Sequence, residues 1–211
     1  MRIGKIFIPT LLLFILFTAF VFATENNGKA DFIGLGFEFG MKRKQAIEVI
    51  KSEGRDIIED TVDSKEIRTI LAEGSFIKLP FNTDSSNLKT RLEFYDDKLM
   101  SSSLIFEAND NSEQTQIEDQ VFNFLINVYG EPGKKEEVLQ FTTWTWQRPN
   151  VVVILSTDPQ NNTTKIQNIY EPVEEARMEK EIEKKQKGPQ EDPAKQMFLD
   201  GDYSRPTQYK R

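Results

Sequence analysis

The chain of 211 residues is acidic, with 27 basic against 34 acidic side chains and a net charge of −7 at pH 7. This balance argues against nucleic acid or an anionic membrane surface as the main partner. The sequence contains no histidine and no cysteine. Their absence excludes Ser-His-Asp triads, cysteine nucleophiles, typical zinc sites and disulfides.

The first segment has the pattern of an export signal. Arg2 and Lys5 give it a positive start, Ile6–Phe22 is an uncharged apolar run, and residues 21–23 offer a cleavage site. The run is short for a membrane span, so we predict a cleaved signal peptide at residues 1–23, with an uncleaved anchor as the alternative. An exported chain without cysteine fits a bacterial periplasm or cell exterior.

The next segment is predicted to contain one helix and several strands. Asp31–Phe39 is expected to be an extended lead-in, followed by an amphipathic helix over Met41–Glu53 with Gly54 as its cap. Ile57–Val62 and Ile67–Leu71 have the composition of strands. Within the lead-in, the glycines at 34, 36 and 40 nearly match a dinucleotide loop. The third glycine falls one residue late, so we interpret them as a bend or turn.

Ser75–Phe81 is a third apolar stretch, which Pro80 is expected to end or to place at a sheet edge. Arg91–Phe106 is predicted to be a hairpin that turns at residues 96–98, with Met100, Leu104 and Phe106 on one side of its returning strand. The serines at 101–103 add little packing, so the outer face of that strand is expected to meet solvent or a partner.

A longer helix and three more strands are predicted to follow. Asp110, Asn111 and Ser112 are good N-cap residues, and Gly130 followed by Pro132 ends the helix. The apolar positions recur at spacings of three and four, which places them on one helix side; they are Ile117, Val121, Phe122, Leu125, Ile126 and Val128. The strands are predicted at residues 143–146, 151–155 and 165–170.

This order of elements predicts an α+β fold over residues 31–170. Runs of strands after each helix imply an antiparallel sheet, or sheets, with two amphipathic helices on one face. Both halves have the order helix then meander, which is compatible with an internal duplication of one unit. The residue-level match between the halves is poor, so independent origins stay open as the alternative.

After Tyr170 the composition changes. Residues 171–187 are charged nearly throughout and predict a solvated helix, in which Glu181 and Lys185 form a favourable pair one turn apart. Residues 188–211 form a polar tail that is predicted to be disordered alone. The tail contains an apolar cluster, interpreted either as chance composition or as a docking motif that binds a partner: Met197, Phe198, Leu199 and Tyr203.

Trp144 and Trp146 are the candidate partner contacts in the domain itself. Strict alternation over residues 143–146 places both rings on one strand face. They either contact a partner or lie in the core, where Phe94, Phe106 and Phe122 could bury them.

No catalytic, cofactor-binding or metal-binding residues are predicted. A carboxylate pair could still hydrolyse glycosides, but each candidate stands where a surface carboxylate is ordinary: Glu38, Glu59, Asp60, Asp63 and Glu93. The oxygen-rich stretches at 109–111 and 200–202 lack the spacing and closing glutamate of a calcium loop. We expect the protein not to be an enzyme.

The Tyr-Gly-Glu-Pro stop at residues 129–132, followed by Trp144 and Trp146, carries a family likeness. It resembles the small periplasmic α/β modules of the outer-membrane assembly lipoprotein and β-lactamase-inhibitor-protein type. The Gly-Met entry at 40–41 and the hairpin Arg91–Phe106 are similar to theirs. The chain lacks the lipidated cysteine of the lipoproteins, which argues against outer-membrane anchoring, and it adds a charged tail. The resemblance implies a non-catalytic role in protein binding or assembly.

The leading functional hypothesis is therefore an exported protein-binding or envelope-assembly accessory module. Its sheet face would dock another envelope or extracytoplasmic protein, with contact to a membrane only through an uncleaved N-terminal segment. One alternative is a structural subunit of a larger extracytoplasmic assembly, such as an appendage or sheath. Another is a small-ligand carrier with a pocket between helix and sheet.

Overall fold

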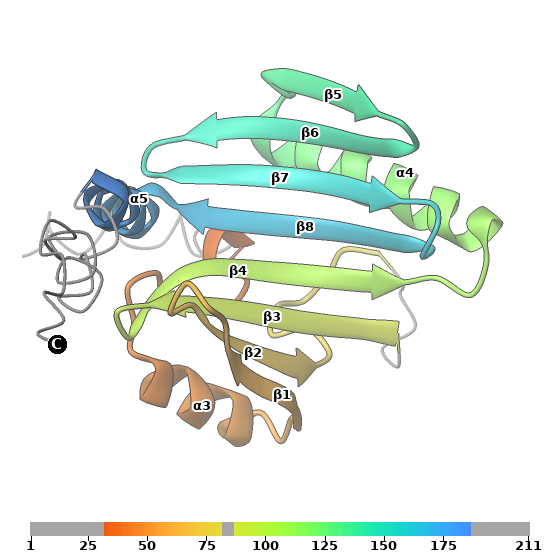
Figure 1. The fold of residues 1–211 in the computed structure, drawn as a ribbon. Coiled ribbons are helices and arrows are strands. Elements are labelled where there is room, and N and C mark those ends of the chain that lie inside the picture. Colours follow the sequence, from red (N-terminus) through yellow and green to blue (C-terminus); the bar gives the residue numbers. More distant parts are fainter. Residues whose placement is uncertain (1–31, 82–86, 187–211) are drawn as a thin grey trace, which may run out of the picture. The chain divides into compact units, whose positions relative to one another are not determined.

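The computed structural model describes residues 32–81 and 87–186, and the chain divides into two compact units after Val173. Figure 1 shows the helices and strands. In chain order these elements are α3 (Arg43–Ser52), β1 (Ile57–Val62), β2 (Arg68–Glu73), β3 (Leu88–Tyr95), β4 (Lys98–Glu107), α4 (Asn111–Tyr129), β5 (Lys134–Val138), β6 (Phe141–Arg148), β7 (Val151–Asp158), β8 (Thr163–Tyr170) and α5 (Glu171–Gln186).

All eight strands form one antiparallel sheet in the order β1-β2-β3-β4-β8-β7-β6-β5. Each half is a helix followed by a four-strand meander, and the last strands of the two meanders, β4 and β8, pair at the centre (Figure 1). The two halves therefore share one topology. Descent from a duplicated unit stays a prediction.

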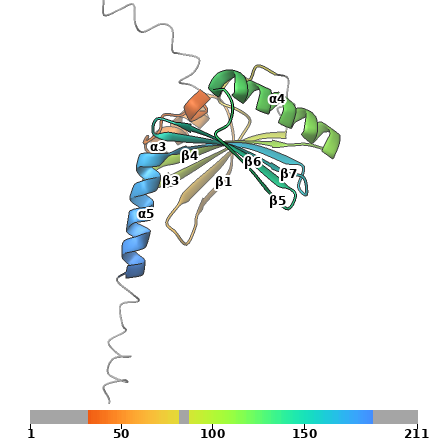
Figure 2. The ribbon, with the colours of Figure 1, turned by 90° about the horizontal axis from the view of Figure 1, so that it is seen from above.

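Helices α3 and α4 pack on the same face of this sheet (Figure 2). Ala46 and Ile50 of α3 are fully buried against β2, β3 and the start of β4. Val121 and Leu125 of α4 are fully buried against β6, β7 and β8. The predicted α+β class, with two amphipathic helices on one sheet face, is confirmed. We call this the covered face and the opposite one the open face.

The ends of α4 follow the predicted chemistry. The Asp110 carboxylate accepts a hydrogen bond from the backbone N–H of Glu113 at 2.9 Å, and the Glu113 carboxylate accepts one from the backbone N–H of Asn109 at 2.7 Å. The first bond satisfies a donor that the first turn of a helix leaves free, and the second joins the residue before the N-cap to that turn. Gly130 ends the helix at φ +79°, a conformation that costs glycine little.

The sequence predicted an extended lead-in at residues 31–39. The described part of this segment instead contains a helical turn at residues 32–34. The backbone N–H of Leu35 donates to Phe32 O at 3.2 Å, and both side chains are buried. The Phe32 ring packs edge-on against Phe124 of α4 at 4.7 Å between centroids. Phe32 and Leu35 are three residues apart. A helical turn places side chains at this spacing on one side, whereas a strand would point them to opposite faces.

The prediction that Met100 shares a side with Leu104 and Phe106 is wrong. The β3–β4 pairing shifts between Glu93 and Phe94, so β4 carries one extra residue opposite β3. Such a bulge changes the side to which the extra residue points. Met100 packs with Tyr95 and Val173 in a separate small cluster, while Leu104 and Phe106 lie under α4.

Two other stretches were read incompletely from the sequence. Ser75–Phe81 belongs to no strand; its apolar side chains Ile77, Leu79 and Phe81 pack against the larger core cluster. Strand β5, with the sequence KKEEV, was not predicted, because every side chain in it is exposed and no apolar alternation marks it.

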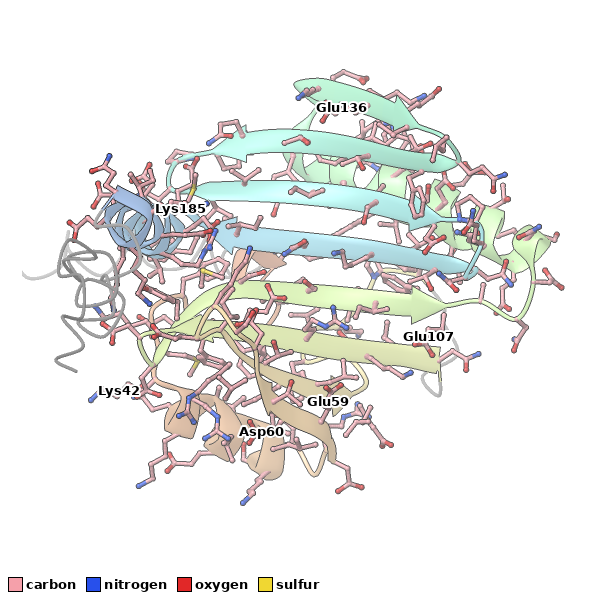
Figure 3. The ribbon with its side chains drawn as sticks, viewed as in Figure 1. Lys42, Glu59, Asp60, Glu107, Glu136 and Lys185 are labelled. Atoms are coloured by element: carbon pink, nitrogen blue, oxygen red, sulfur yellow. The ribbon has the colours of Figure 1, made fainter. Side chains whose placement is uncertain are left out.

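The two edges of the sheet differ. The β5 edge carries alternating charges, with Lys134 paired to Glu136 at 2.9 Å and Lys135 to Glu137 at 2.6 Å. The β1 edge contains no lysine and exposes Ile58 and Val62. Figure 3 shows Glu59 and Asp60 at the β1 edge and Glu136 at the other.

The second unit is described by itself. Within α5, Arg177 donates to Glu174 at 2.6 Å and to Glu181 at 3.0 Å. These carboxylates raise the pKa of the Arg177 guanidinium. The predicted pair of Glu181 and Lys185 is present at 3.2 Å. Ion pairs one turn apart thus support a helix that has few apolar residues.

Candidate docking surface

The open face of the sheet is the most distinctive surface of the first unit. Neither α3 nor α4 packs on it, and Val173 reaches only the small cluster with Tyr95 and Met100 at its end. The strand register places five apolar side chains on this face, interspersed with polar and charged ones: Leu71, Ile105, Val152, Ile154 and Ile169. Apolar side chains grouped on an uncovered sheet face are typical of a surface that a partner covers.

A trough of small residues runs along β4 in the middle of this face. Ser101 and Ser103 point to the open face, whereas Ser102 points to the covered face opposite Asn168. Ser101 and Ser103 are each only 1% exposed, although α3 and α4 lie on the opposite face. The longer side chains of the flanking strands β3 and β8 therefore close over the serines.

Three charged side chains border this trough and form what we call the cationic centre: Arg91 and Glu93 on β3, and Lys165 on β8. The register places Arg91 opposite Ser103, which in turn pairs with Gln167 on β8. Lys165 lies one row away, opposite Ile105. Two cations and one carboxylate leave one excess positive charge in the middle of an acidic protein.

The electrostatics of the cationic centre reflect partial burial. Burial lowers the pKa of the Lys165 ammonium, the nearby Arg91 lowers it further, and Glu93 acts in the opposite direction. The Nε atom of Arg91 is buried without a hydrogen-bond partner. Among the described residues, neither Arg91 nor Lys165 has an ion-pair partner within 4.0 Å.

Hydrogen bonds fix part of this arrangement. Lys165 Nζ donates to Gln167 Oε1 at 3.1 Å, and Gln167 Nε2 donates to Ser101 Oγ at 3.0 Å. Nearer the ends of β3 and β4, Lys89 is neutralised by Glu107 at 2.7 Å. The open face therefore contains the ion pairs Lys89–Glu107 and Lys134–Glu136 and, between them, a cationic centre without such a pair.

The rim of the open face carries four carboxylates, of which Glu107 and Glu136 are paired with lysines. By register it carries Glu59 on β1, Glu107 on β4, Asp158 on β7 and Glu136 on β5. Figure 3 labels Glu59, Glu107 and Glu136. The hairpin between β5 and β6 adds the exposed apolar residues Val138, Leu139 and Phe141 at one corner.

The structure places Trp144 and Trp146 on the covered face, with 8% and 2% of their surfaces exposed. Both rings pack against Phe122 of α4, at 5.1 and 6.3 Å between centroids. The Trp146 indole N–H donates to Gly130 O at 2.8 Å. These contacts correspond to the core alternative, and a partner contact through either ring stays a prediction. The tail candidates Met197, Phe198, Leu199 and Tyr203 lie outside the described residues.

The carboxylates considered for catalysis have separate surroundings. Asp60 forms an ion pair with Arg43 of α3, and Asp63 accepts hydrogen bonds from the backbone N–H groups of Lys65 and Ile67 in the β1–β2 turn. Glu93 belongs to the cationic centre. Across residues 32–81 and 87–186, no group of three or more Asp or Glu side chains could hold a metal ion.

Sequence reasoning missed Arg91 and Lys165. They are 74 positions apart in a chain whose β4–β8 pairing was not predictable, and each alone looks like an ordinary surface cation. The serine run in β4 was the only readable signal for this place. In the described part of the chain, no helix is long and apolar enough to cross a membrane.

Comparison with models of protein families, with curated proteins and with solved structures finds no match to this chain.

Proposed function

We propose that this protein is an exported, non-catalytic module that binds another envelope protein through the open face of its sheet. The observation that carries the proposal is the set of apolar side chains on a sheet face that α3 and α4 leave uncovered. Burial of these side chains against a partner is favourable by about 25 cal/mol per Å² of apolar surface.

Three further features support a binding role. The sequence has no histidine or cysteine to supply acid–base or nucleophilic chemistry near neutral pH. The first 23 residues have the pattern of an export signal. The open face combines apolar side chains with polar and charged ones, and protein–protein interfaces have such a mixed composition.

Site-specific photocrosslinking tests this proposal. A benzophenone amino acid would replace Thr145, which lies on the open face of β6 opposite Ile154, and the chain would be irradiated in the cells that produce it. The matched control carries the same group at Asn123, an exposed position on α4. We expect a discrete adduct with another protein at position 145 and none at position 123. Equal labelling at both positions, or none at either, would contradict docking through the open face.

A further inference from the structure

We infer that the cationic centre receives an aspartate or glutamate side chain of the partner, so that the open face selects a protein presenting a carboxylate within an apolar patch. This inference rests on the proposed docking through the open face. It adds the chemistry of the contact at the middle of that surface.

The first argument is the unmet charge of the two cations. Arg91 and Lys165 both border the serine trough, yet among the described residues no carboxylate lies within ion-pair distance of either. The single carboxylate of the group, Glu93, influences Lys165 electrostatically from farther away. An incoming carboxylate would supply the missing partner.

The second argument is the geometry around them. An arginine guanidinium offers a planar fork of N–H donors that suits a carboxylate, and Arg91 keeps one buried donor unused. On β4 the register places Ser103 and Ile105 between the two cations, so no charged side chain of that strand separates them. Ile105, Ile154 and Ile169 lie around this position, so contact with a partner would remove the charges from water and strengthen their attraction.

The third argument distinguishes one carboxylate from a polyanion. The rim carboxylates Glu107 and Glu136 are paired with Lys89 and Lys134, which leaves the charges of Glu59 and Asp158, and the whole chain is acidic. A nucleic acid or an anionic lipid surface would bring many negative charges against this rim and be repelled. A single acidic side chain surrounded by apolar or basic groups fits both the centre and the rim.

Zero-length crosslinking with a water-soluble carbodiimide tests the inference directly. The reagent joins an amine to a carboxylate as an amide only when the two groups are in contact. Cells that produce the full chain would be treated, and the crosslinked peptides mapped by mass spectrometry. The chain would carry Glu93→Gln, which removes the carboxylate that acts electrostatically on Lys165 and could form an internal link with it.

The expected product is an amide between Lys165 and an aspartate or glutamate of another protein. Lys165→Gln in the same background should abolish this product. Lys134 is the internal control, because it is a lysine on the same face that already pairs with Glu136 and should give mainly the link to that residue.

The outcomes separate this inference from the proposed function. A photocrosslink from position 145 without any intermolecular link at Lys165 would overturn the carboxylate contact and leave docking through the open face intact. Absence of both would overturn both. A Lys165 link to a second copy of this chain, recognised in mixtures of light and isotope-labelled protein, would overturn the inference in favour of self-association.

Affinity measurements with the crosslinked partner complete the test. Arg91→Met and Lys165→Met should each weaken binding by about tenfold or more, since each leaves a carboxylate desolvated without its cation. Glu93→Gln should strengthen binding, because it removes a competing negative charge. Lys134→Met should change the affinity little. Equal affinities for wild type, Arg91→Met and Lys165→Met would overturn the inference.

Discussion

At the scale of single residues, Lys165 is a charged side chain at a partly buried position of the open face, where folding alone would favour an uncharged one. Its side chain bears a charge that burial disfavours, and burial lowers its pKa. The charged groups that face it come from β3 and β4: Arg91, Glu93 and the pair of Lys89 with Glu107. Ser156 of β7 adds only a hydroxyl. A residue that opposes folding at such a place is more readily explained by binding.

We predict that Lys165→Met leaves the protein at least as stable as wild type at pH 7. The lowered pKa means that the folded state binds fewer protons than the unfolded state between that pKa and the ordinary value of 10.5. Stability from this group therefore rises with pH across that window. Urea unfolding of both proteins should show that the free energy of unfolding of the wild type, relative to that of the variant, is larger at pH 10 than at pH 7. A variant clearly less stable at pH 7 would contradict the argument.

The backbone conformation at residue 36 requires glycine. Gly36 adopts φ +91°, and a Cβ atom there would lie 2.7 Å from the carbonyl oxygen of Phe76. Gly36→Ala should destabilise the fold by about 2–4 kcal/mol, from the unfavourable φ and the clash together. Gly54→Ala is the control, because Gly54 also has positive φ (+66°) but no atom within 4 Å. Thermal melting should show a clearly larger loss at position 36; equal losses would refute the role of the clash.

At the scale of elements, the start of α4 depends on one cap. Asp110→Ala removes the acceptor of the Glu113 N–H and should cost about 1 kcal/mol of unfolding free energy. Ser112→Ala, at an exposed neighbouring position that makes no cap hydrogen bond, should cost much less. Chemical denaturation of the two variants gives the comparison. A larger effect at Ser112 would show that the cap is elsewhere.

Elements whose signals lie within one stretch of sequence could be predicted. Features that depend on the pairing of separate strands could not. Helix α4 has apolar spacing, an N-cap and a terminal glycine within one stretch, so its bounds were predictable. Strand β5 lies at an edge and needs no apolar face, so nothing marked it. The bulge that turns Met100 away arises from the pairing of β3 with β4, which no single strand encodes.

The candidate site was predictable to the same limited extent. The serine run identified β4 as an unusual strand, because its small side chains stand out locally. Arg91 and Lys165 become neighbours only through the register of β3, β4 and β8. The tryptophan pair stayed open between a partner contact and the core, because alternation gives two faces without saying which one a helix covers.

At the scale of the whole molecule, the two topological halves do not have separate cores. The larger cluster joins Val121 and Leu125 of α4 and both tryptophans to side chains of the first half; these include Phe32, Leu35, Leu88, Leu104 and Phe106. The apolar cluster under α3, which contains Ala46 and Ile50, lies in the first half alone.

We therefore predict that the fragment 108–173 does not fold alone, because the first half covers part of its apolar surface. Circular dichroism and the dispersion of amide signals in NMR would show an unfolded or molten chain. Mixing it with the fragment 24–107 should restore β-structure at a stoichiometry of one to one. A fragment 108–173 that melts cooperatively by itself would contradict the shared core.

The unlike edges of the sheet limit how copies of this chain could join by strand addition. A filament that grows through sheet edges needs a receptive strand at each end of every subunit. Here the β1 side offers unpaired backbone next to Ile58 and Val62, whereas the β5 side has a row of paired charges that a further strand would have to disturb. If two β1 strands paired about a twofold axis, the receptive edge that the described sheet offers would be used up in each molecule. Polymerisation by this route would end at a pair, which weighs against an appendage built by continuous sheet extension.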